Sequence, residues 1–139
     1  MITQTLCNVF KLNVLKGLED FDPASSYVYK IALYDAFADL GADTLVYTTA
    51  NEVTGGGYTA GGETLTKIAP ALDGSTAVVT FNNVTWSPAT FSARCALIYN
   101  STTNAAVAVL DFGATKTAGG TFTVTFPIAN ANSAIIRIS

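Results

Sequence analysis

The chain contains no histidine among its 139 residues, and histidine is the side chain that most often transfers protons at neutral pH. Its absence excludes serine triads, cysteine–histidine pairs and histidine-bearing metal sites. The two cysteines, Cys7 and Cys95, lie far apart in apolar surroundings, so we expect buried free thiols in a reducing compartment, with a disulfide as the alternative. We predict that the protein is not an enzyme and has no catalytic residue, cofactor or metal site.

Carboxylates are the remaining candidates for chemistry, because Asp35, Asp39 and Asp43 recur at every fourth position. On a helix they would share one face and form an acid/base or calcium-binding cluster. The alternative is a turn exposed to solvent, which we favour. The glycines of Asn51–Gly62 do not match a phosphate-binding loop, since no Gly-Lys-Ser/Thr sequence follows them. We expect these glycines to allow tight turns or close approach of the backbone at an interface.

Charge is also scarce, at 12% of the residues against 50% that are hydrophobic. The seven lysines and arginines are scattered singly, so no nucleic-acid partner is expected. A surface so poor in charge predicts cover by another protein subunit, and the alternative is a surface made soluble by Thr, Asn, Ser and Gly. No apolar run is long enough to cross a membrane, and Lys11 and Lys16 follow the first apolar stretch, unlike the charges of a signal peptide. We therefore expect folding in a cytoplasm.

The N-terminal region has the pattern of a helix, which we predict over Thr3–Lys16. Its apolar residues recur at three- and four-residue spacing and form one face: Leu6, Val9, Phe10 and Val14, widened by Leu12 and Leu15. Thr3 or Thr5 is suited to cap its first turn, and Gly17 is suited to the left-handed position after its last turn. We predict that residues 1–26 form a helix and linker that act as a docking arm, with Leu6, Val9, Phe10 and Val14 as the interface candidates.

From Tyr27 onward the pattern is that of strands separated by polar turns. Strands are predicted at Tyr27–Tyr34, Leu45–Thr48, Glu63–Ala69, Ala77–Phe81, Phe91–Tyr99, Ala105–Phe112, Thr121–Phe126 and Ala134–Ile138. Turns are predicted at Asp73-Gly74-Ser75, Asn82-Asn83, Ser87-Pro88, Asn100–Asn104, Gly113–Gly120 and Pro127–Ser133. Residues 27–139 are therefore predicted to form an antiparallel β-sandwich or jelly-roll-like domain of about eight strands, and the fold class is all-β with one short N-terminal helix.

Two of these strands, Tyr27–Tyr34 and Ala105–Leu110, are apolar on both faces. A sandwich that stands alone leaves one face of most strands in contact with water. Their second faces are therefore expected to be covered by the helix of the same subunit, by another subunit or by both. We predict a homo-oligomer, a trimer, whose interface includes the helix.

Three single residues have two interpretations each. Arg94 and Arg137 lie inside apolar strands, so each guanidinium either points to solvent or pairs with a carboxylate such as Asp111. Trp86 is the only tryptophan, and we favour core packing over a platform for a ligand.

The sequence also resembles a group of small virion-associated proteins of tailed bacteriophages. The resemblance is carried by Met1–Phe10, Lys30–Tyr34, Tyr47–Gly62, Val84–Trp86, Phe91–Asn100, Ala106–Phe112 and Ala134–Ser139. These stretches together run along nearly the whole chain. The resemblance implies a structural protein of the virion, and it transfers no catalytic residue to this chain.

The function expected from residues and resemblance together is that of a capsid decoration (cement) protein. Such a protein is made in the cytoplasm of the bacterial host, sits on the assembled head as a trimer and braces the major capsid protein. The alternative is a tail-associated fibre or adhesin module that contacts the host surface.

Overall fold

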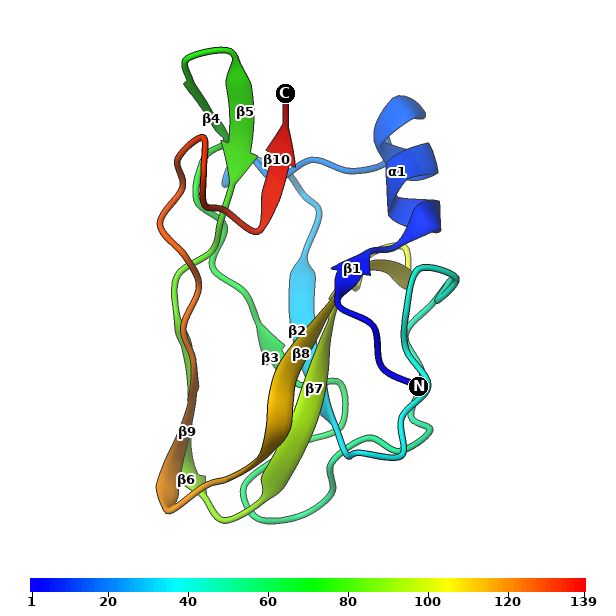
Figure 1. Ribbon diagram of the computed structural model, residues 1–139, viewed down its shortest axis with the longest axis vertical. Coiled ribbons are helices and arrows are strands. Elements are labelled where there is room, and N and C mark those ends of the chain that lie inside the picture. Colours follow the sequence, from blue (N-terminus) through cyan, green and yellow to red (C-terminus); the bar gives the residue numbers. More distant parts are fainter.

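The computed structural model describes residues 1–139 as two packed layers of antiparallel strands with one helix, α1 (Asn8–Leu15) (Figure 1). The strands are β1 (Thr5–Leu6), β2 (Tyr29–Tyr34), β3 (Glu63–Thr64), β4 (Ala71–Asp73), β5 (Thr76–Val79), β6 (Val84–Ala89), β7 (Ser92–Asn100), β8 (Ala105–Thr117), β9 (Gly120–Val124) and β10 (Ile136–Ile138). The all-β, sandwich-like prediction is confirmed, with ten strands in place of about eight.

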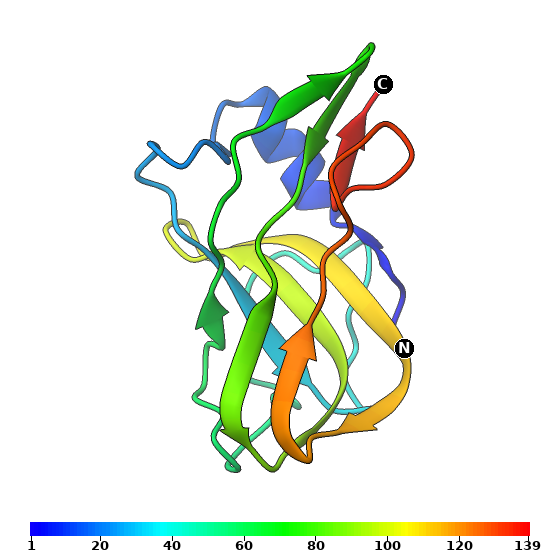
Figure 2. The same cartoon turned by 90° about the vertical axis from the view of Figure 1, so that its left-hand side faces the viewer.

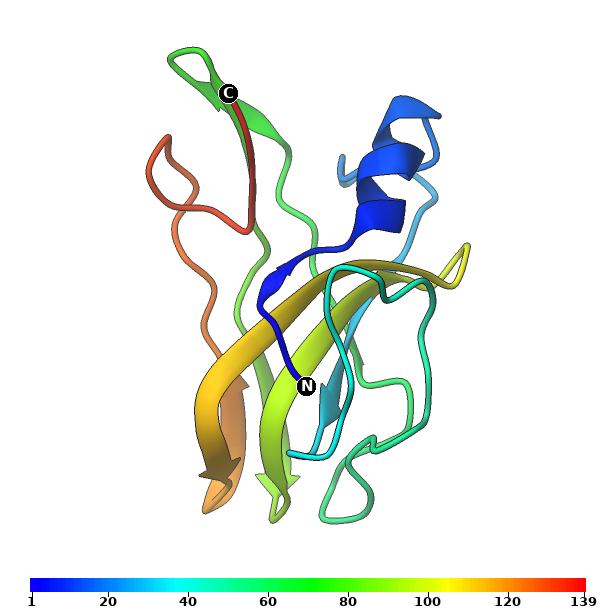
Figure 3. The same ribbon diagram turned by 45° about the vertical axis from the view of Figure 1, so that its right-hand side comes forward.

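The first layer is a five-stranded antiparallel sheet in the order β1-β8-β7-β2-β3 (Figure 3). Its centre is β7, which pairs with β2 along six residues and with β8 along most of its length. The turn between β7 and β8 is tight, and Asn104 adopts the left-handed conformation there. These long pairings are formed by the apolar segments that the sequence predicts as strands.

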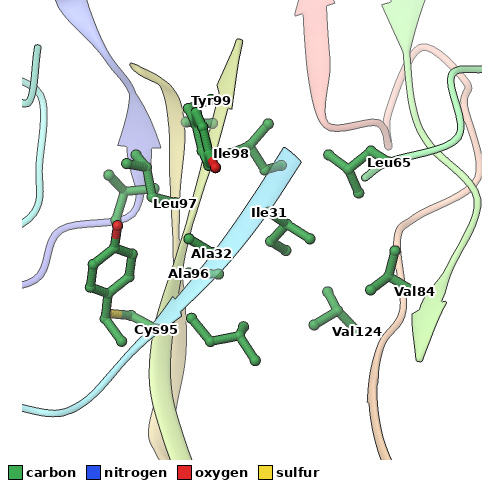
Figure 4. Packing of buried hydrophobic residues seen from close by; sticks show 14 of the residues in the cluster. Ile31, Ala32, Leu65, Val84, Cys95, Ala96, Leu97, Ile98, Tyr99 and Val124 are labelled. Carbon is green, nitrogen blue, oxygen red and sulfur yellow. The ribbon is translucent and has the colours of Figure 1, made fainter. Parts of the chain in front are cut away.

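The second layer consists of two smaller groups of strands. The pair β6–β9 lies over one half of the main sheet, and the three-stranded sheet β10-β5-β4 continues the layer toward the end that carries α1 (Figure 2). Side chains from both layers fill the space between them: Ile31 of β2 points toward Leu65, Val84 and Val124 (Figure 4). In β9, Phe122 and Val124 are buried while Thr121 and Thr123 are exposed, as their alternation predicts.

The outer face of the main sheet is covered by residues 35–62 of the same chain, which we call the cover segment. Tyr99 stacks on Tyr47 of this segment with ring centroids 4.7 Å apart. The Tyr34 hydroxyl donates to the Thr48 carbonyl at 2.6 Å, and the Tyr99 hydroxyl donates to the Gly61 carbonyl at 2.7 Å. The strands that are apolar on both faces are thus buried largely within a single chain, by the cover segment and by α1, which packs against β8.

A buried carboxylate organises the cover segment. Glu52 accepts hydrogen bonds from the hydroxyls of Tyr47 and Tyr58, each at 2.5 Å, and from the backbone N–H of Gly61 at 2.8 Å. The Tyr58 hydroxyl in turn accepts from the Leu33 N–H of β2 at 2.9 Å. Burial, and then the hydrogen bond to Glu52, raise the pKa of Tyr58 far above its ordinary value, so this hydroxyl remains a protonated donor.

The glycine-rich part of the cover segment approaches the strands closely. Gly62 has a φ of +77°, and a Cβ atom there would lie 1.8 Å from the Ile31 carbonyl oxygen. Gly57, at φ +92°, has the same relation to the Pro88 carbonyl, with a Cβ-to-oxygen distance of 2.0 Å. The close approach expected of these glycines is confirmed, but their neighbours are strands of the same chain and not a partner.

The helix is shorter than predicted. Thr5 and Leu6 pair with Val109 and Ala108 as strand β1, because the edge of β8 offers them backbone partners, and α1 begins only at Asn8. Neither predicted threonine caps α1, whose N-cap position is Cys7 without a side-chain hydrogen bond. Leu12 and Leu15 are exposed, so they do not widen the buried face.

The end of α1 follows the prediction. Gly17 adopts the left-handed conformation with a φ of +72°. The N–H of Gly17 donates to the Val14 carbonyl at 3.1 Å, and the N–H of Leu18 donates to the Asn13 carbonyl at 2.9 Å. This pair of bonds is the Schellman motif, which satisfies carbonyls that the last turn leaves free.

Several strand predictions need correction. Ser87 and Pro88 belong to β6 and not to a turn, because β6 pairs on one side only and its register shifts at this point, where proline is tolerated. The predicted strand Leu45–Thr48 forms only the isolated bridge between Val46 and Ala105, since it crosses the outer face of the main sheet. Residues 113–117, predicted as a turn, extend β8 beside β7.

The close approach of Gly62 generates a stability prediction. We expect Gly62→Ala to lower the free energy of unfolding by about 3 kcal/mol or more, since the added Cβ forces the cover segment away from β2. Gly55→Ala is the matched control, because Gly55 also has a positive φ, +71°, but nothing within 4 Å of the added atom. Gly55→Ala should lower the free energy of unfolding by only ~1 kcal/mol, which is the cost of holding alanine in the left-handed conformation. Urea denaturation measures both variants, and equal losses would contradict the close approach.

Candidate functional site

The four predicted interface residues lie where β1 passes into α1. Leu6 is in β1, and Val9, Phe10 and Val14 are on α1. Phe10 is only 3% exposed and packs edge-on against Phe21, with ring centroids 5.9 Å apart, so it is a core residue of the single chain. The other three are partly buried. The structure brings Leu6, Phe10 and Val14 together along one groove, and Val9 lies outside that groove.

The groove runs between α1 and β10 at one end of the molecule, which we call the helix end (Figure 1). Its volume is about 270 Å³. Its lining consists of Leu6, Phe10, Lys11, Val14, Leu15, Ile136 and Ile138. All of these except Lys11 are apolar, although the groove is open to solvent.

Exposed apolar side chains surround this groove. Leu15 is 87% exposed and Ile138 is 56% exposed. Leu72 of β4, in the same sheet as β10, is 74% exposed. Exposed apolar groups that gather beside a groove mark an interaction surface. The sequence does not predict Ile138 or Leu72 as site residues. The signal for Ile138 is the apolar–polar alternation of Ile136-Arg137-Ile138, which places both isoleucines on one face of a strand, and no such pattern marks Leu72.

The linker after α1 is attached to the β-layers through Asn100, which is fully buried at the end of β7. Its Nδ2 donates to Glu19 Oε1 at 2.9 Å, and its Oδ1 accepts from the N–H groups of Thr102 and Thr103. Glu19 Oε2 is buried and has no hydrogen-bond partner. Burial raises the pKa of Glu19 to about 7, although the bond from Asn100 opposes the shift.

Further contacts join residues 1–26 to the rest of the chain. Phe21 stacks on Tyr29 with ring centroids 4.4 Å apart, and the Asp20 N–H donates to the Tyr29 hydroxyl at 3.0 Å. Lys67 Nζ donates to the carbonyls of Ser25 and Tyr27. The helix and linker therefore share one hydrophobic core with the β-layers, and their docking role stays a prediction.

The carboxylates at positions 35, 39 and 43 lie on loops and a turn and not on a helix, so they form no helical cluster; Asp39 and Asp43 are exposed and Asp35 is partly buried. Asp35 accepts from the Phe37 N–H at 2.8 Å, Asp39 lies 3.4 Å from the N-terminal amine, and Asp43 accepts from the Asn8 amide at 3.0 Å. No group of three or more His, Cys, Asp or Glu side chains is placed to hold a metal ion.

Two of the remaining residue predictions concern buried groups. Cys7 and Cys95 are free and fully buried, and burial raises the pKa of each thiol to about 11. Trp86 is buried among aromatic rings that include Phe91 and Phe122, which confirms core packing.

The two arginines have different partners. Arg94 forms an ion pair with Asp111, the carboxylate considered for it. Arg137 is exposed and donates to the Ala131 carbonyl at 3.0 Å.

Comparisons with known proteins identify no family: no family model, no curated protein and no solved structure matches the chain. No helix of the structure has the length and hydropathy needed to cross a membrane. What the protein does must therefore be inferred from its own residues, and the helix end is the surface that distinguishes it.

The half-satisfied carboxyl of Glu19 generates a prediction about pH. Between pH 4.5 and 7 the folded protein keeps a proton that the unfolded chain has lost, so the free energy of unfolding should fall as pH rises through this window. Glu19→Gln should remove about 1–3 kcal/mol of that fall. Urea denaturation at pH 4.5, 6 and 8 measures the difference between the variant and the unaltered protein. Glu63→Gln, at an exposed carboxylate, is the control. A stability difference between Glu19→Gln and the unaltered protein that stays constant with pH would contradict the raised pKa of Glu19.

Proposed function

We propose that the protein is a non-enzymatic structural component of a phage virion, a capsid decoration protein that sits on the assembled head and braces the major capsid protein. The observation that carries this proposal is the apolar helix end, where Leu15 and Ile138 stand exposed beside an open apolar groove. A lone soluble domain rarely leaves such groups together in water. Another subunit in the assembled particle would cover them.

Two further features support an assembled state. Only 12% of the residues are charged, and protein–protein contact regions are depleted of charge at their core. The main sheet is largely covered by its own chain, and the helix end keeps an open apolar groove beside exposed apolar side chains. The assignment to a virion rests on the resemblance of the sequence to small virion-associated proteins. The proposed partners are further copies of the chain, which form a trimer, and the major capsid protein.

The number of copies per particle tests this function. Quantitative mass spectrometry of purified virions should find the protein at a copy number comparable with that of the major capsid protein, since a decoration protein follows the repeat of the head lattice. Removal of the protein should lower the temperature at which the heads open. A copy number comparable with that of tail proteins would contradict the decoration role and favour the tail-associated fibre or adhesin module. Absence from the virion would contradict both.

A further inference from the structure

The sheet at the helix end has two free edges. Its order is β10-β5-β4, so β10 and β4 each pair with β5 on one side and have no strand partner on the other. The free edge of β10 faces α1 across the apolar groove (Figures 1 and 3). The unpaired backbone groups of an edge strand are a template for a strand from another chain. Both edges are short and have no strand beside them, while the loop at Ala131 bonds to one side chain of each edge strand, Asp73 of β4 and Arg137 of β10.

The register of this sheet aligns one exposed leucine with the groove. Leu72 of β4 pairs with Ala77 of β5, and Ala77 pairs with Ile138 of β10. Directly paired residues lie on the same face of a sheet, so Leu72 and Ile138 share a face. Ile138 lines the groove, and that face is therefore the one turned toward α1. If a second β4 were added beside β10 in the register that sets its Leu72 opposite Ile138, this Leu72 would point into the groove.

Charge supports the same pairing. The elements that line the groove, β1, α1 and β10, contain the cations Lys11 and Arg137 and no carboxylate. Strand β4 ends with Asp73, whose side chain lies on the opposite face of the sheet from Leu72, because successive residues alternate. Arg137 lies on that opposite face too, since it alternates with Ile138. In the same register, a second β4 at this edge brings its Asp73 to the face that carries the exposed Arg137 guanidinium, beside the chain's own Asp73, which already accepts from the Ala131 N–H at 2.6 Å.

We propose that β4 of one copy of the chain adds to the free edge of β10 of the next copy and places its Leu72 in the groove between β10 and α1. The two surfaces are different, so each copy uses its β4 edge toward one neighbour and its groove toward the other. Such a head-to-tail contact closes into a ring when the rotation between copies permits it. The inference rests on the proposed function only for the choice of a trimer.

Light scattering on the purified full chain tests this interface without any virion. The unaltered protein should have several times the 14.5 kDa mass of one chain. Leu72→Asp and Ile138→Asp should each weaken the association at least ~30-fold and give monomers, since each places a charge in the groove. Phe37→Asp, at a position 84% exposed in the cover segment, is the matched control and should leave the mass unchanged. Circular dichroism checks that the variants remain folded, and Leu72→Ala replaces any that does not.

Mixing the two variants distinguishes this contact from a symmetric one. The Leu72→Asp chain keeps an intact groove and the Ile138→Asp chain keeps an intact β4, so their mixture should form a 1:1 dimer that neither forms alone. A monomeric unaltered protein at millimolar concentration, variants that remain oligomeric, or a mixture without dimer would overturn the proposal. The copy number in virions is independent of these outcomes: a ring-forming chain absent from virions refutes the proposed function alone, and a monomeric chain abundant in virions refutes this interface alone.

Discussion

The hydrogen bonds of the Glu52 carboxylate are the interaction on which the rest of the structure depends. This buried acceptor holds two tyrosine hydroxyls and the Gly61 N–H, and through Tyr58 it joins the cover segment to the backbone of β2. A buried charge is stable only when its lone pairs are satisfied, and three donors satisfy these. As a result the outer face of the main sheet is dry, with Tyr34, Leu97 and the stacked Tyr99 shielded by residues 35–62.

This closure determines where a partner can bind. Because both faces of β2 and β7 are covered within one chain, the apolar strands themselves offer no surface for association. The helix end stays open, because α1 and β10 lie side by side without filling the space between them. The sheet there also keeps two unpaired edges, one on β4 and one on β10. The same chain thus covers its central strands by itself and keeps one end suited to assembly.

Much of this fold follows from local patterns. The alternation in Thr121–Phe126, the continuous apolar runs of β2, β7 and β8, and the glycine after α1 predict the all-β class and the end of the helix, because each signal depends on neighbours in the sequence.

The features that the sequence did not predict depend on contacts between distant segments. Pro88 is tolerated in β6 only because that strand is unpaired on one side, and β1 replaces the first helical turn only because β8 offers it an edge. Glu52 is one carboxylate among several in the sequence, and its three donors are brought to it by the fold. The helical spacing predicts Leu6, Val9, Phe10 and Val14 as interface candidates. Leu72 and Ile138, in contrast, are aligned by the register of a sheet that no local pattern specifies.

The central claim is that residues 35–62 close the main sheet within one chain through Glu52, and Glu52→Gln tests it most directly. An amide offers one acceptor oxygen and adds two donors, so the variant should lose about 2–4 kcal/mol of unfolding free energy and leave tyrosine hydroxyls unsatisfied. Glu63→Gln is the control, because it makes the same change at an exposed site, and it should leave the free energy of unfolding unchanged. Amide hydrogen exchange along β2 and β7 should accelerate in Glu52→Gln alone. Equal stability and equal protection in the two variants would contradict the account.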